Sequence, residues 1–227
     1  MSDTPIRINR FIAQSTGLSR RGADAAIDEG RVTVNGTQPQ QGQTVTTADV
    51  VTLDGQPVQA TEITTTIMLN KPVGYVVSRN GQGSQTVYDL LPSNLQTLKP
   101  VGRLDKDSSG LLLLTNDGEL ANELTHPSRQ KTKIYEAKLN APLAPLHRQM
   151  IAEMGVQLDD GPSKLGLDRA QEDNDRVWIV TMHEGRNRQI RRTFSALGYT
   201  VTALHRTQFG PYHVGDVARG AYVAVEV

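Results

Sequence analysis

The sequence predicts an α+β protein with two domains, and three observations support this fold class. Four consecutive leucines, Leu111 to Leu114, lie between two polar turns and predict a short strand that is buried on both faces. Residues 134–139 alternate between apolar and polar side chains, as a half-buried strand requires, and residues 177–182 form another strand. Apolar side chains at helical spacing recur near the N-terminus and in residues 188–197.

Composition excludes several classes of protein. The chain of 227 residues is 37% apolar and 21% charged, so it can bury a core and is not a disordered chain. The absence of cysteine excludes disulfides, thiolate catalysis and thiolate-rich metal sites. No stretch approaches the roughly 20 apolar residues that a membrane span requires. We therefore expect a cytoplasmic protein without membrane contact, and a monomer.

Charge is unevenly distributed along the chain. The 24 basic and 24 acidic residues cancel, which by itself does not indicate a nucleic-acid partner. Between His183 and Arg206, however, five arginines stand against one acid, Glu184; they are residues 186, 188, 191, 192 and 206. This basic half predicts an anionic partner.

The first 60 residues or so predict a small α/β unit of their own. Ile8, Phe11 and Ile12 have helical spacing, and Ser19 is placed to cap a second helix. Asn35-Gly36 and Asp54-Gly55 predict hairpin turns between short strands. A polar, threonine-rich stretch follows, and we place the boundary there, with domains at residues 1–62 and 63–227.

Residues 5–52 resemble a known RNA-binding module. The stretch RINRFIAQSTGLSRRGADAAIDEGRVTVNG is similar to the S4-like domain, in which two helices and the following strand present basic residues to structured RNA. The resemblance implies RNA contacts by four arginines, Arg7, Arg20, Arg21 and Arg31. Acidic residues are interspersed among them, so we expect modest affinity from this module alone.

Two helical patterns stand out in the second domain. Ile190, Phe194 and Leu197 fall on one side of a predicted helix, and Arg188, Arg191 and Arg192 fall on the other. Three arginines without an acidic neighbour predict either phosphate contacts or a buried carboxylate partner. Leu146, Met150 and Met154 form a second helical stripe, which we expect to lie in the core.

Asp105 and Asp107 precede the leucine strand, and the residues alone leave their role open. The spacing Asp105-x-Asp107-x-Ser109-Gly110 imitates the start of an EF-hand loop. Asn116, however, stands where that loop needs a bidentate glutamate, which excludes calcium. An aspartate that caps a turn at the entrance of a strand is the ordinary structural interpretation. A catalytic carboxylate is the alternative.

A family resemblance favours the catalytic interpretation. The stretch GRLDKDSSGLLLLTNDG closely resembles the signature of pseudouridine synthases, in the branch typified by RsuA, RluB, RluE and RluF. Lys133-Ile134-Tyr135 and the stretch EGRNRQIRR from Glu184 match two further motifs of that branch in the same order. The motifs are most similar to those of large-subunit members such as RluF. The resemblance implies a catalytic domain with a central mixed, mainly antiparallel sheet flanked by helices.

The resemblance also implies an activity and assigns roles to residues. The expected reaction isomerises a uridine of ribosomal RNA, here of the large subunit, to pseudouridine. Asp105 matches the catalytic carboxylate and Arg191 its cationic partner, which leaves Asp107 as a turn residue. Tyr135 matches the tyrosine that packs on the target base. Arg103 is expected to fill the space left by the flipped base, and Leu204 to contribute to the uracil pocket.

The resemblance predicts ribosomal RNA as the partner and no cofactor or metal, because the isomerisation is redox-neutral and needs no group donor. Arg188 and Arg192 are the expected phosphate contacts of the basic helix. Two alternatives stay open. One is a non-catalytic RNA-binding or ribosome-assembly factor, and the other is an enzyme for small-subunit ribosomal RNA.

Overall fold

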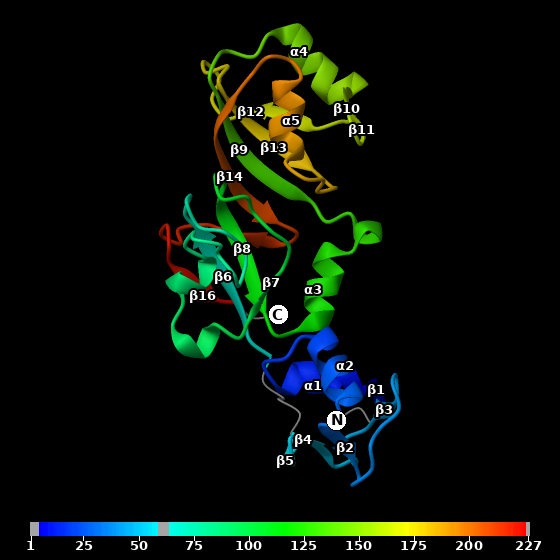
Figure 1. The fold of residues 1–227 in the computed structure, drawn as a ribbon. Coiled ribbons are helices and arrows are strands. Elements are labelled where there is room, and N and C mark those ends of the chain that lie inside the picture. The colour runs from blue at the N-terminus through cyan, green and yellow to red at the C-terminus, as the bar shows by residue number, and fades with distance from the viewer. Residues whose placement is uncertain (1–4, 59–63, 226–227) are drawn as a thin grey trace. The chain divides into compact units, whose positions relative to one another are not determined.

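The structure is a computed structural model that describes residues 5–58 and 64–225. The chain divides into two compact units, residues 1–64 with 116–118 and residues 65–115 with 119–227 (Figure 1). The boundary expected between residues 62 and 63 lies outside the described residues.

The first unit combines two helices with short strands. Its elements are β1 (Ile6–Arg7), α1 (Ile8–Ser15), α2 (Arg20–Asp28), β2 (Val32–Val34), β3 (Thr44–Val45), β4 (Val51–Leu53) and β5 (Gln56–Pro57). β1 pairs with β3, and β4 lies between β2 and β5 in a second antiparallel sheet.

Local chemistry explains the boundaries of these elements. The Ser19 hydroxyl accepts a hydrogen bond from the Gly22 amide (3.0 Å) and so caps α2, as the sequence predicts. The turn at Asn35 and Gly36 has positive φ at both residues (50° and 81°), which is the backbone of a type I′ hairpin turn. Ile8 and Ile12 are fully buried in the small core of this unit, so the predicted apolar face of α1 is confirmed.

The second unit is built on one large mixed sheet. Its strands are β6 (Thr66–Lys71), β7 (Lys99–Pro100), β8 (Ser109–Thr115), β9 (Lys133–Leu139), β12 (Gly166–Arg169), β13 (Val177–Met182), β14 (Val201–Phe209), β15 (Tyr212–His213) and β16 (Tyr222–Ala224). The order is β12-β13-β9-β14-β8-β6-β16, with β7 beside β8 and β15 beside β14. Every pair is antiparallel except β14 with β8, so the predicted mixed, mainly antiparallel sheet is confirmed.

Strand β8 lies inside this sheet and is buried on both faces. Leu111 and Leu113 pack into one apolar cluster, Leu112 and Leu114 pack into the other, and all four are 0% exposed. The prediction from the leucine run is therefore confirmed. A strand held from both sides keeps the turn before it in a fixed position.

Helices and a small hairpin surround the sheet. They are α3 (Gly118–Thr125), α4 (Pro145–Gln149), a π-helix (Met150–Met154), the hairpin β10 (Val156–Leu158) with β11 (Gly161–Ser163), and α5 (Gln189–Ser195). Short 3₁₀ helices cover Val87–Leu90, Ser93–Leu95 and Pro127–Arg129. Ile190 and Phe194 on α5 are buried, as the helical pattern predicts.

The expected core stripe of Leu146, Met150 and Met154 is wrong. Leu146 is 64% exposed and Met154 is 74% exposed, whereas Ile151 is fully buried in their place. A π-helix begins at Met150, and its wider turn changes the direction of the Met154 side chain, whereas Leu146 lies before it in α4 and is exposed there. A calculation at 100° per residue does not anticipate this change of phase.

Candidate functional site

The turn before β8 holds Asp105 in place through its backbone. Lys71 at the end of β6 is 0% exposed, and its ammonium group donates three hydrogen bonds. The acceptors are the carbonyl oxygens of Asp105 (3.0 Å), Ser108 (2.6 Å) and Pro72 (3.1 Å). An ammonium group has three donors, so all of them are used. Burial lowers the pKa of Lys71 to about 8, and the charges of Asp105 and Asp107 oppose that shift.

Both aspartates meet Arg188, which immediately precedes α5. Its guanidinium donates two hydrogen bonds to the Asp107 carboxylate (2.9 and 2.8 Å) and lies 3.3 Å from Oδ2 of Asp105. The hydrogen bonds from Arg188 hold the pKa of Asp107 below its usual value. The expectation that Asp107 has only a turn role is therefore wrong, because its carboxylate anchors an arginine between the two acids.

Arg191 takes a different position from the one expected. It ion-pairs with Asp107 (Nε to Oδ2, 3.3 Å) rather than with Asp105. Its terminal nitrogens donate to the carbonyl oxygens of Asp107 (2.8 Å) and Val201 (2.7 Å). Arg191 thus ties α5 and the start of β14 to the aspartate turn, and Arg188 is the residue that contacts Asp105 directly. The arginine face contacts the carboxylates of Asp107 and Asp160, but both are half-exposed and not buried as one of the two alternatives expected.

Arg188 adopts a left-handed backbone conformation (φ 46°, ψ 31°) at the N-cap of α5. Such a conformation is disfavoured for an L-residue by about 1 kcal/mol, so neighbouring contacts must maintain it. It turns the chain from the loop at 184–187 into the helix while the side chain reaches the aspartates.

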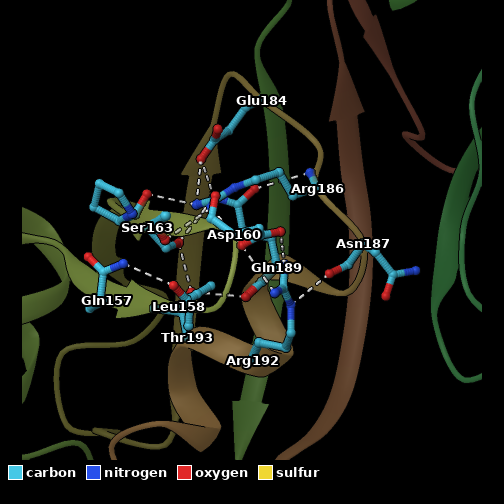
Figure 2. Close-up of polar contacts among 12 residues, drawn as sticks. Gln157, Leu158, Asp160, Ser163, Glu184, Arg186, Asn187, Gln189, Arg192 and Thr193 are labelled. Carbon is cyan, nitrogen blue, oxygen red and sulfur yellow. Dashed lines mark hydrogen bonds and ion pairs between the residues drawn. The ribbon is translucent and has the colours of Figure 1, made fainter.

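A polar network holds that loop (Figure 2). Arg186 donates to the Asp160 carboxylate (2.8 Å) and to the carbonyl oxygens of Asp160, Gly161 and Pro162 in the β10–β11 hairpin. Arg192 donates two hydrogen bonds to the same carboxylate (3.1 and 2.7 Å) and one to the Asn187 carbonyl oxygen (2.9 Å). Asp160 thus links Arg186, which precedes Arg188 in the loop, to Arg192 on α5.

The buried side of α5 is fixed to the same hairpin. Gln189 donates to the Ser163 hydroxyl (3.0 Å) and to the Glu184 carboxylate. Thr193 donates to the Ser163 hydroxyl (2.8 Å). Ser163, Gln189 and Thr193 are all buried, so these hydrogen bonds are protected from water (Figure 2).

A cavity of about 910 Å³ opens beside the aspartate turn. Six predicted site residues line it together, namely Arg103, Asp105, Tyr135, Arg188, Arg191 and Leu204. Tyr135 on β9 and Leu204 on β14 are 7% and 6% exposed, and they form part of its apolar wall. The volume falls in the range of small-molecule sites and accommodates a base with its sugar.

The remaining predicted residues lie elsewhere. Arg192 is on α5 but points to Asp160. Arg7, Arg20, Arg21 and Arg31 belong to the first unit and are all exposed. Arg31 donates two hydrogen bonds to Asp54 (2.7 and 2.6 Å), so it is already paired with a carboxylate.

The sequence reasoning did not single out Lys71, Asp160 or Arg206 as site residues. Arg206 on β14 lines the cavity and is only 2% exposed. The one available signal for Lys71 and Arg206 was a basic residue close to apolar residues within a strand.

The described part of the chain contains no group of three histidine or acidic side chains that could hold a metal ion. The expectation of a cofactor-free reaction stays a prediction. No helix within residues 5–58 and 64–225 is long and apolar enough to cross a membrane.

A half-buried carboxylate held against an arginine, in a cavity with an aromatic and aliphatic wall, is an arrangement typical of an enzyme site. Comparison with known proteins identifies the family. The model of the RNA pseudouridylate synthase family matches residues 65–196, which contain the aspartate turn, Tyr135 and α5. The chain belongs to this family.

Relatives match most of the chain. The ribosomal large subunit pseudouridine synthase B of Bacillus subtilis (strain 168) is 38% identical over 92% of this chain and 90% of its own length. The dual-specificity RNA pseudouridine synthase RluF of Salmonella typhi is 33% identical over 98% of this chain and 76% of its own. A crystal structure of a pseudouridylate synthase has 30% identity and a TM-score of 0.70, covering 97% of this chain and 96% of that one.

Proposed function

We propose that this protein isomerises a uridine of large-subunit ribosomal RNA to pseudouridine, with Asp105 as the catalytic carboxylate. The observation that carries this assignment is the position of Asp105. Its carboxylate lines the cavity, its carbonyl oxygen is fixed by Lys71, and Arg188 lies 3.3 Å from Oδ2. Family membership and the names of the relatives from Bacillus subtilis and Salmonella typhi support the substrate class.

The geometry suits a reacting carboxylate. The Asp105 side chain is 33% exposed, so a substrate can reach it. A carboxylate at this position can attack the sugar or the base, or remove a proton. Arg191 positions the aspartate turn, because it holds the Asp107 backbone and carboxylate to α5.

The rest of the cavity fits a flipped nucleotide. A base stacked within folded RNA cannot reach a carboxylate in a cavity, so it must leave the stack first. Tyr135 offers an aromatic wall against which the uracil packs, and Leu204 completes the apolar side. Arg103 is exposed at the rim, where a planar cation can occupy the space that the base vacates.

Arginines on both units are proposed to bind the RNA backbone. Arg188 and Arg192 have side chains that are 42% and 28% exposed, so both can also reach a phosphate. The first unit is proposed to act as an S4-like RNA-binding module, with Arg7, Arg20, Arg21 and Arg31 exposed on it. Phosphate contacts of this kind predict affinity that falls steeply with salt.

The variant Asp105→Asn tests the assignment. It keeps the size of the side chain and removes the charge, and we expect it to lower single-turnover pseudouridine formation by about 10⁴-fold or more while RNA affinity is retained. Asp168→Asn on the exposed strand β12 is the matched control and should react like the wild type. Equal activity of Asp105→Asn and wild type would overturn the catalytic role of Asp105, whereas a wild type that forms no pseudouridine would favour the non-catalytic RNA-binding factor.

The substrate requires a separate experiment. Pseudouridines should be mapped in both ribosomal RNAs from cells with and without the gene. We expect a single site in large-subunit RNA to lose its modification. A site lost from small-subunit RNA instead would reassign the substrate without affecting the role of Asp105.

A further inference from the structure

Arg206 is a buried cation whose hydrogen bonding is incomplete. Its Nε donates to the Leu111 carbonyl oxygen (2.8 Å), and Nη1 lies 3.5 Å from the Tyr135 hydroxyl. Nη2 is buried and has no hydrogen-bond partner. An arginine cannot lose its proton in a protein, so the charge stays. Leaving a charged donor unpaired in the interior costs more free energy than leaving a neutral donor unpaired.

Nε of Arg186 and of Arg191 is also buried without a hydrogen-bond partner in the described part of the chain, but the guanidinium groups of these two arginines form ion pairs with carboxylates. Lys71 is buried like Arg206, but three carbonyl oxygens satisfy its ammonium group. The arginines at 186, 188, 191 and 192 all contact carboxylates. Among the residues that the structure describes, no carboxylate forms an ion pair with Arg206. The positive charge of Arg206 is therefore available to a group other than the described carboxylates.

The surroundings of Arg206 indicate where that partner would come from. Its guanidinium carbon lies 4.9 Å from the centre of the Phe209 ring and 6.0 Å from that of Tyr135. The Lys133 ammonium lies 5.5 Å from the same Phe209 ring. All four side chains line the cavity that contains Asp105. One wall of the cavity thus combines two cations with two aromatic rings.

The backbone fixes this wall relative to the aspartate turn. Arg206 pairs with Gly110 where β14 runs parallel to β8. A Cβ at Gly110 would lie 2.2 Å from the Arg206 carbonyl oxygen, so only glycine permits this approach. Gly110 follows Asp105 by five residues along the same turn and strand. The position of Arg206 is therefore set by the segment that sets Asp105.

The reaction generates negative charge that such a cation would stabilise. If Asp105 attacks the sugar, or assists elimination, the N1–C1′ electron pair leaves with the uracil and spreads over its two carbonyl oxygens. If Asp105 adds to the base at C6, the electrons of the C5–C6 double bond pass to the oxygen on C4. The uracil becomes an anion in each case, before C5 bonds to C1′ and the C5 proton is released.

We propose that Arg206 is a catalytic residue whose Nη2 donates to a carbonyl oxygen of the uracil and stabilises the anion. This rests on the proposed isomerase function. A base, rather than a phosphate, is the partner because Arg206 is 2% exposed between aromatic rings, a place that a flat ring reaches and a hydrated backbone phosphate does not. Preorganised donors aimed at a developing charge are a large source of catalysis.

The test compares Arg206→Met with the wild type and with Lys138→Met, an exposed residue on β9, as the matched control. Single-turnover pseudouridine formation should fall about 100-fold in Arg206→Met, the usual loss for one such donor, with an unchanged Kd for the RNA. The melting temperature should stay the same or rise, because an apolar side chain replaces a buried unpaired charge. Arg206→Lys keeps a charge and should lose less rate; it carries the test if the methionine variant does not fold.

Two results would overturn the proposal. A folded Arg206→Met protein that reacts at the wild-type rate on saturating RNA would make Arg206 a packing residue. A loss confined to Kd, and absent when a neutral methylphosphonate replaces a phosphate beside the target uridine, would make it a phosphate contact. Failure of the wild type itself to form pseudouridine would contradict the proposed function instead, and Asp105→Asn in the same assay separates the two.

Discussion

Arg188 and Arg206 line the same cavity but have opposite surroundings. Arg188 is half-exposed, spans two carboxylates and is held in a left-handed conformation by the loop around it. Arg206 is buried among aromatic rings and has an unpaired nitrogen. A paired arginine organises groups of the protein before the substrate binds, whereas an unpaired one is available to charge that arises during the reaction. The cavity therefore has an acid side, formed by Asp105, Asp107 and Arg188, and a cation side, formed by Arg206 and the aromatic rings beside it.

Removing Arg188 should have the larger effect on the acid side. In Arg188→Met the two aspartates lose their shared cation, and Asp105 loses its only ion pair among the described residues. We expect single-turnover rates to fall roughly 100-fold, because misplacement of a catalytic group by about 1 Å can cost that much. Arg169→Met removes another arginine–carboxylate pair, with Asp175, and is the matched control. A wild-type rate would show that the pairing is structural only.

Asp160 extends the comparison to a residue that does not touch the cavity. Asp160→Asn weakens the contacts of Arg186 and Arg192 and so loosens the loop that carries Arg188. We expect a decrease in kcat of about tenfold with KM unchanged, because charge-assisted hydrogen bonds are stronger than neutral ones and those to Asp160 position the loop of Arg188. Asp159→Asn, its neighbour in the hairpin turn, is the control. A change in KM alone would indicate that Asp160 affects RNA binding rather than the position of Arg188.

Lys71, which binds the backbone of the aspartate turn, should make the stability of the protein depend on pH. Its pKa is about 8 in the folded protein and roughly 10.4 when unfolded. Between these values the unfolded chain binds a proton that the folded protein has lost, so stability contributed by this residue rises with pH. The melting temperature of the wild type, minus that of Lys71→Met, should therefore increase from pH 8 to 10. A difference that falls over this range would contradict the lowered pKa.

Asp107 should show a dependence of the same sign in the acid range, with the smallest effect. Its folded pKa is lowered by Arg188, so the pairing stabilises the protein above the unfolded pKa of about 3.9 and is lost as the pH falls through the lower folded value. The wild type should exceed Arg188→Met in stability by no more than about 1 kcal/mol at neutral pH, because both side chains are half-exposed. Thermal unfolding from pH 6 to 2.5 should show this difference disappear.

The sequence predicted the acid side far better than the cation side. The leucine strand, the aspartate turn and the arginine face of α5 follow from local patterns, and the structure brings them together. Which arginine contacts which aspartate did not follow, because Arg188 leaves the helical backbone and spacing alone does not show it. The contacts of Asp160 with Arg186 and Arg192 join segments 26 and 32 residues apart, which no local pattern reveals.

Arg206 lies on a strand with irregular geometry, yet its position could have been predicted. Strand β14 has register shifts between Val201 and Ala203 and between Arg206 and Gln208. Each shift breaks the period of two locally, but neither lies between Leu204 and Arg206, so alternation from Leu204 does place Arg206 on the cavity side. The sequence reasoning did not extend that period from Leu204 to Arg206. The π-helix that begins at Met150, by contrast, changes the helical phase before Met154, which no regular period anticipates.

A structure of the Asp105→Asn protein with a ribosomal RNA fragment containing the target uridine tests the central claim most directly. The account predicts that the uridine is flipped into the cavity, with its base against Tyr135, its sugar beside residue 105 and a uracil carbonyl oxygen within hydrogen-bond distance of Arg206 Nη2. A base bound elsewhere, or a backbone phosphate beside Arg206 in place of the uracil, would contradict it.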